Sequence, residues 1–260
     1  MEQCTALREL DLYDNRLAQL EGLEACTRLT YLDVSFNVIE RVENLSHLTC
    51  LEELYLIENK LSQLPPAAEF DAPLSKLTLL ELGGNRFRSL GALQLPLLTK
   101  LWVGKNKLTS LRDVRLPHLR LLSMQSNRLV TFRELPAFER LDELYLSHNG
   151  LETLADLAPS IVRTLRVLDV GTNRVTSLAA LPAFRRLAEL WINNNKLETM
   201  AELEIVKTQC GATLECLFAE GNPLASSTQY RPKVALLLEQ LEELDGTPLV
   251  RPNWAPPPSN

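Results

Sequence analysis

The sequence predicts an α/β solenoid, in which short coils of chain stack to form a curved parallel sheet on the concave side and 3₁₀ turns or short helices on the convex side. Three observations carry this prediction. An asparagine recurs every 21 to 27 residues, leucines stand at fixed offsets before it, and both patterns run through ten copies. Repeats of this length indicate stacked supersecondary units.

Each copy follows the frame L-x-x-L-x-L-x-x-N-x-L, with some leucines replaced by other apolar residues. The seventh copy has Leu141, Leu144, Leu146, Asn149 and Leu151 at these positions. Leucines two residues apart lie on the same side of a strand and are expected to face the interior. Because one coil cannot bury its own leucines, the frame predicts a leucine-rich-repeat stack of about ten coils.

The recurring asparagines are expected to be structural. The turn after each strand points the side chain inward, where its amide must find hydrogen-bond partners among free backbone groups of neighbouring coils. The ten positions are Asn15, Asn37, Asn59, Asn85, Asn106, Asn127, Asn149, Asn173, Asn195 and Asn222.

Three copies are longer than the others. Prolines in the segment 65–73 favour an exposed loop there. The stretch before Leu165 is expected to form a fuller helix, and residues 199–212 a longer one. The apolar pattern in that last segment consists of Met200, Leu203, Val206 and Cys210.

The ends of the chain differ from the repeats. We expect a solenoid over residues 1–222, a C-terminal cap over 223–250 and a disordered proline-rich tail over 251–260. No capping helix precedes Leu7, so the first coil is expected either to be frayed or to follow further repeats. In the cap, helical spacing predicts a helix that carries Val234, Leu237, Leu238, Leu241 and Leu244.

Composition bears on the cellular compartment. The chain has 260 residues, 45% of them apolar, and no apolar run long enough to cross a membrane. Its N-terminus lacks the basic stretch and apolar core of a signal peptide. The five cysteines are odd in number and include no CxxC pair, which is typical of free thiols in a reducing compartment. We therefore expect a cytoplasmic and nuclear protein.

The frame also predicts which side chains point outward from the sheet. Four residues before each asparagine, five positions are aromatic, four are acidic and none is basic, although only 6% of the chain is aromatic. These positions are Asp11, Asp33, Tyr55, Glu81, Trp102, Ser123, Tyr145, Asp169, Trp191 and Phe218. The positions six and two residues before each asparagine add five glutamates and a single base, Lys100. The glutamates are Glu9, Glu53, Glu143, Glu189 and Glu220.

Outward aromatic side chains are typical anchors of protein interfaces, and the acids around them favour a basic partner surface. Nucleic acid is disfavoured because its phosphates would meet carboxylates. A purely structural alternative is that the aromatic rings only pack on one another across strands. The expected partner-binding residues are Asp33, Tyr55, Glu81, Trp102, Tyr145, Asp169, Glu189, Trp191 and Phe218.

No pattern indicates catalysis. His47, His118 and His148 fall in different repeats, without cysteines or carboxylates at metal-ligand spacing. Asp169 and Glu189 could act as a general acid and base, but an open face does not exclude water. We expect a non-enzymatic protein without metal or cofactor that is monomeric apart from its partner and contacts neither nucleic acid nor membrane.

Several segments resemble the regulatory subunit 7 family of protein phosphatase 1. They include residues 122–129 (LSMQSNRL), residues 143–150 (ELYLSHNG) and the cap from Asn222 to Asp245, and the resemblance runs from about residue 1 to 251. It implies binding of the type 1 Ser/Thr phosphatase catalytic subunit through the concave face. The carried-over positions are Asp33, Tyr55, Glu81, Trp102, Asp169, Glu189, Trp191 and Phe218.

This chain departs from that family at the segment 65–73 and lacks its further N-terminal repeats. Two other hypotheses stay open. One is a structural adaptor similar to the axonemal dynein light chain. The other is a spliceosomal protein similar to the leucine-rich partner of an RNA-binding protein, which shares this kind of C-terminal cap.

Overall fold

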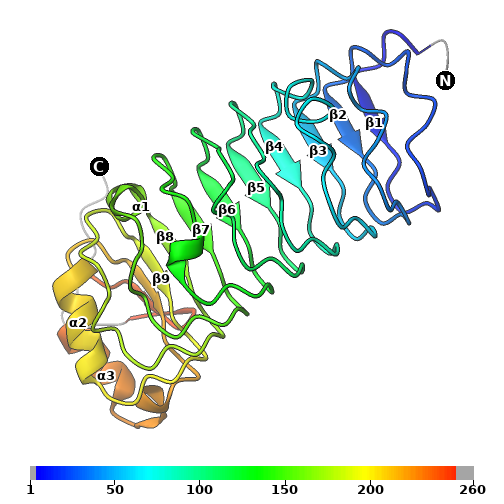
Figure 1. The fold of residues 1–260 in the computed structure, drawn as a ribbon. Helices are drawn as coiled ribbons and strands as arrows, with labels where there is room; N and C mark the ends of the chain where they lie inside the picture. The colour runs from blue at the N-terminus through cyan, green and yellow to red at the C-terminus, as the bar shows by residue number, and fades with distance from the viewer. Residues whose placement is uncertain (1–3, 250–260) are drawn as a thin grey trace, which may run out of the picture.

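The computed structural model describes residues 4–249, which form one stack of coils (Figure 1). Each coil contributes one short strand, and successive strands pair in the order of the sequence. The first ten strands pair in parallel, which confirms the predicted solenoid. They are β1 (Glu9–Asp11), β2 (Tyr31–Asp33), β3 (Glu53–Tyr55), β4 (Leu79–Glu81), β5 (Lys100–Trp102), β6 (Leu121–Ser123), β7 (Glu143–Tyr145), β8 (Val167–Asp169), β9 (Glu189–Trp191) and β10 (Cys216–Phe218).

A leucine occupies the middle of each of these strands and pairs in register with the leucine of the next, as Leu144 does with Leu168. From β2 onward these leucines are buried, while the first and third residues of most strands are only partly buried. The strands therefore turn their middle residue inward and their outer residues toward solvent. One continuous apolar core runs from Leu20 to Leu244. Each buried leucine contributes about 2 kcal/mol relative to an exposed one.

The asparagines form a ladder inside the stack. Asn127 is representative: its Nδ2 donates to Val103 O of the preceding coil at 2.9 Å and to Met124 O of its own coil at 3.1 Å. Its Oδ1 accepts from the backbone N of Leu108 at 2.9 Å. Coils two to ten all repeat this tie to the coil before them. Asn15 differs because it is exposed and bonds only within its own coil, to Leu12 O and Tyr13 O.

The convex side contains few helices. Turns replace the expected 3₁₀ helices in the first five coils, and short helices begin with the 3₁₀ helix η1 (Phe132–Glu134). The helices predicted before Leu165 and within 199–212 are confirmed as α1 (Pro159–Thr164) and α2 (Ala201–Cys210). Helix α2 buries Leu203, Val206 and Cys210, three residues of the predicted apolar pattern.

The exposed loop expected at 65–73 is confirmed for most of the segment, since residues 66–69 and Ala72 are exposed, but two of its residues are buried. Phe70 is fully buried, and its backbone N donates to Pro66 O at 3.1 Å, which folds the prolines into a compact turn over the core. Asp71 is also buried, and its carboxylate accepts from the backbone N of Gln94 in the next coil at 2.8 Å. Prolines fit the first turn of a helical segment, and here they begin an exposed turn that ends on the buried side chains of Phe70 and Asp71.

The C-terminal end also differs from the expectation. The 3₁₀ helix η2 (Pro223–Ser226) leads into α3 (Tyr230–Leu237), which ends before three of the leucines assigned to it, Leu238, Leu241 and Leu244. Leu241 and Leu244 instead belong to an eleventh coil, whose strand β11 (Glu243–Leu244) pairs in parallel with β10. Strand β12 (Thr247–Pro248) then pairs antiparallel with β11. The tail, 251–260, lies outside the described residues.

Two general expectations are tested only within the described part of the chain. All five cysteines are free thiols, with Cys26 and Cys210 buried in the core. Between residues 4 and 249, no helix is long and apolar enough to cross a membrane.

Candidate protein-binding face

The concave face consists of the first and third residues of strands β1–β10. In the structure the third residues form one uninterrupted row, in which Tyr55 pairs in register with Glu81, Glu81 with Trp102, and Asp169 with Trp191. Neighbouring strands lie about 4.8 Å apart, so the row spans the length of the stack. Aromatic and acidic side chains thus stand side by side along a single line.

The acids of this row have a local role that the repeat frame does not reveal. Asp33 accepts a hydrogen bond from the backbone N of Ser35 at 2.8 Å, and Asp169 accepts one from Gly171 at 2.9 Å. Asp11 and Glu81 bond in the same way to the residue two positions further on. Each carboxylate therefore stabilises the turn that follows its strand, in addition to the charge it gives the face.

Asp169 is less available than expected. It is only 2% exposed, and its second oxygen accepts from Gln125 Nε2 at 3.1 Å. Ser123, in the same row, is buried as well. With both oxygens occupied, Asp169 positions its neighbours more than it presents a free carboxylate. This arrangement also leaves it unsuited to pair with Glu189 as a general acid or base.

The two tyrosines of the row are fixed by glutamates of their own strands. Tyr55 Oη donates to Glu53 Oε2 at 2.9 Å, and Tyr145 Oη donates to Glu143 Oε2 at 2.8 Å. Burial, followed by these glutamate bonds, raises the pKa of both phenols well above the ordinary value. Each phenol therefore stays protonated and keeps its hydrogen bond to the glutamate of its own strand.

Two pairs of aromatic rings pack on one another, one on β2 and β3 and one on β9 and β10. Trp191 packs on Phe218 with ring centroids 4.9 Å apart, and Tyr31 packs on Tyr55 at 5.3 Å. Such pairs agree with the packing alternative, but all four side chains keep part of their surface exposed. The indole Nε1 of Trp191 is buried without a hydrogen-bond partner among residues 4–249. An unpaired buried donor is uncommon in folded proteins.

Glu81 is a partly buried acid of the face whose pKa is raised. It lies half-buried between Tyr55 and Trp102 in the row. Burial raises its pKa from 4.5 to about 7, although the bond from the backbone N of Gly83 opposes the rise. The charge on this part of the face therefore changes near neutral pH.

Three residues of this region were missed at the sequence level. Tyr31 stands in the first-residue row and packs on Tyr55, and its place in the frame was visible. Glu243 and Asp245 extend the acidic surface into the eleventh coil, where the frame was mistaken for a helix.

Burial and the charges of Glu243 and Glu189 raise the pKa of the Cys216 thiol to about 12.

Nothing within the described residues groups three or more histidine, cysteine or acidic side chains in a way that could hold a metal ion. His47 instead lies 2.7 Å from the backbone oxygen of Leu23 through its Nε2, on the convex side.

Residues 5–47 match the family model described as Leucine Rich repeats (2 copies). The same leucine and asparagine frame, with the same ladder contacts, continues through the later coils. The fold is the leucine-rich-repeat solenoid. No curated protein sequence matches the chain at a significant level.

Solved leucine-rich-repeat structures are similar over most of the chain. The LRR protein LIC12759 of Leptospira interrogans has 26% identity and a TM-score of 0.68, with 93% of this chain and 67% of that chain covered. YopM of Yersinia enterocolitica has 30% identity and a TM-score of 0.63, with 85% of this chain and 43% of that chain covered. FLRT2 (LRR), in an octameric complex with Latrophilin 3 and Unc5D, has 22% identity and a TM-score of 0.72, with coverages of 92% and 76%.

The chain thus spans about two thirds of the Leptospira protein and less than half of YopM. These likenesses establish the repeat and the fold, an architecture that commonly mediates protein–protein interaction. The finer resemblance to the phosphatase regulator stays a prediction.

Proposed function

We propose that this chain is a non-catalytic scaffold that binds a basic surface of a protein partner through its concave face. The observation that carries the proposal is the in-register row of aromatic and acidic side chains from Asp33 to Phe218. Partly exposed tryptophan and tyrosine side chains are the residue types that dominate interface energies. The repeat fold supports this role, and the leucine-rich-repeat protein FLRT2 occurs in a multiprotein complex.

The acids decide the kind of partner. The first residues of the strands include Glu53, Glu143 and Glu189, and the third residues include further acids. Lys100 is the only base in these two rows. Such a surface attracts a basic partner and speeds its association at low ionic strength. It repels nucleic acid.

The sequence resemblance names the first partner to test, the catalytic subunit of type 1 Ser/Thr phosphatase. In that role the chain is a regulatory subunit of the cytoplasm and nucleus, monomeric until it meets the enzyme. An adaptor of the axonemal dynein light chain kind, or a spliceosomal partner of an RNA-binding protein, is the alternative.

Titration calorimetry with the purified type 1 catalytic subunit tests the proposal. We expect a one-to-one complex that weakens as salt rises. The variant E53Q/E189Q, which removes two concave carboxylates, should weaken it several-fold. The matched control E40Q/E152Q, which removes two exposed carboxylates away from the strand rows, should not.

Absence of binding to the catalytic subunit would contradict the proposal that the partner is the phosphatase. Tubulin or a dynein motor domain, and an RNA-binding domain, are then the probes for the two alternatives. Equal weakening by both double variants would contradict the concave face as the binding surface.

A further inference from the structure

A row of basic side chains lies just beyond the concave face, directly after the asparagine ladder. In the third to ninth coils the residue after the asparagine is basic six times out of seven and never acidic. Lys and Arg make up 27 of the 260 residues, or about one in ten, so this position is strongly enriched. We call these side chains the basic row: Lys60, Arg86, Lys107, Arg128, Arg174 and Lys196.

The backbone holds the basic row in register. Arg86 N donates to Leu61 O at 2.8 Å, Arg128 N to Leu108 O at 2.9 Å, and Arg174 N to Leu151 O at 2.8 Å. In each case the acceptor lies one coil earlier, and the other members of the row repeat the contact. Successive side chains therefore leave the stack at equivalent points, about 4.8 Å apart where coils are adjacent.

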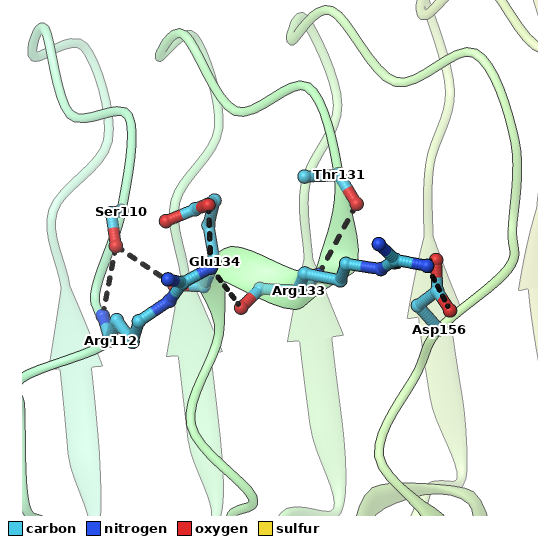
Figure 2. Close-up of polar contacts among 6 residues, drawn as sticks. All are labelled: Ser110, Arg112, Thr131, Arg133, Glu134 and Asp156. Atoms are coloured by element: carbon cyan, nitrogen blue, oxygen red, sulfur yellow. Dashed lines mark hydrogen bonds and ion pairs between the residues drawn. The ribbon is translucent and has the colours of Figure 1, made fainter.

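No member of the basic row has a side-chain hydrogen bond or ion pair with another residue in the described range 4–249. Four of the six are exposed, and Lys60 and Lys107 are half-exposed. Arginines elsewhere behave differently: Arg112 pairs with Glu134 at 2.9 Å and Arg133 with Asp156 at 2.9 Å, each one coil further along (Figure 2). Ion pairs between coils are thus readily made in this fold, yet the basic row lacks them.

We infer that the basic row is a second interaction surface, one that binds an extended acidic segment of a protein. The row is a single residue wide and crosses six coil-to-coil steps, roughly 29 Å at 4.8 Å per step, which corresponds to about nine residues of extended chain. A peptide fits that width. A nucleic acid fits poorly because it would also face the acidic strand rows, and the row offers no aromatic rings to stack bases.

Together with the concave face, this surface would let one scaffold hold a basic and an acidic protein at once. The inference does not rest on the proposed function, since it concerns residues outside the strands. Either surface can therefore fail its test while the other passes.

Fluorescence anisotropy with a labelled decaglutamate peptide and the full chain tests the inference. We expect binding that weakens with salt and falls at least tenfold in R86Q/R128Q/R174Q. The control R112Q/R120Q/R163Q carries the same change in net charge but removes arginines that are already ion-paired. It should bind within twofold of the parent chain, because exposed ion pairs contribute little to stability.

K60Q/K107Q/K196Q provides a second row variant should the first one unfold, as judged by circular dichroism. The inference is overturned if the peptide does not bind, if the control triple variant weakens binding as much as the row variants, or if an oligothymidylate of equal charge binds as tightly as the peptide.

Discussion

At the scale of single residues, the asparagine ladder shows how one side chain joins two coils. The amide of Asn127 satisfies carbonyl oxygens in its own and the preceding coil and accepts a backbone N–H in return. Removal of the amide leaves the backbone N–H of Leu108 without its acceptor, whereas Val103 O still accepts from Asn106 and Met124 O from Asn149. Net hydrogen-bond contributions are small, but stranded buried groups are costly.

We therefore expect Asn127→Ala to lower the free energy of unfolding by about 1–3 kcal/mol. Asn15→Ala is the matched control, because Asn15 is exposed and bonds only within its own coil. It should cost well under half as much. Urea denaturation of both variants measures the difference, and equal losses would contradict the ladder as a tie between coils.

Glu81 gives a pH-dependent prediction at the same scale. Its pKa is raised from 4.5 to about 7, so the folded chain holds a proton that the unfolded chain releases between these values. Its contribution to stability is fully present below pH 4.5 and is lost as the pH rises through 7.

Glu81→Gln removes this titration and keeps an oxygen that can accept from Gly83. The variant should gain stability relative to the parent chain as the pH rises from 5 to 8, by an amount on the order of 1 kcal/mol after allowance for solvent screening. Thermal or urea unfolding at the two pH values measures it. A difference that does not change with pH would show that Glu81 titrates normally.

At the scale of elements, the strands were predictable and two segments were not. The frame places a leucine in the middle of each strand, and backbone pairing then leaves only one register. Between 238 and 244 the frame failed because leucines three residues apart suit both a helix and the turn that enters each coil. At 65–73 the prolines were visible, but the burial of Phe70 depends on a gap between coils that no local pattern reveals.

The burial of Phe70 within the turn at 65–73 makes a prediction of its own. Phe70→Ala should lower the free energy of unfolding by about 3–5 kcal/mol, because a fully buried ring leaves a cavity. Its neighbour Glu69 is exposed, so Glu69→Ala should change stability by less than about 0.5 kcal/mol. If both variants were equally mild, Phe70 would be as exposed as the rest of the segment.

Site prediction from sequence divides in a similar way. Which side chains stand on the concave face follows from the strand alternation alone, and the pairing places them in one row. How accessible each one is does not follow, because Asp169 is covered by contacts from another coil, including Gln125. The basic row could also have been read from the asparagine frame, but its lack of ion pairs requires the structure.

At the scale of the whole molecule, the stack separates two charged surfaces. Acidic and aromatic side chains line the strands, and unpaired basic side chains follow the asparagines in the third to ninth coils. A long continuous apolar core supports both surfaces from inside the stack. The central claim is that the concave face is the one that meets the basic partner.

The measurement that tests this claim most directly is the dissociation constant of the complex with the type 1 catalytic subunit for Trp191→Ala and for Phe36→Ala. Phe36 is the matched control, an exposed aromatic residue outside the strand rows. We predict that Trp191→Ala weakens binding by about 2 kcal/mol or more, roughly thirtyfold, and that Phe36→Ala changes it less than twofold. Unchanged affinity in Trp191→Ala, alongside weaker binding in Phe36→Ala, would contradict the claim.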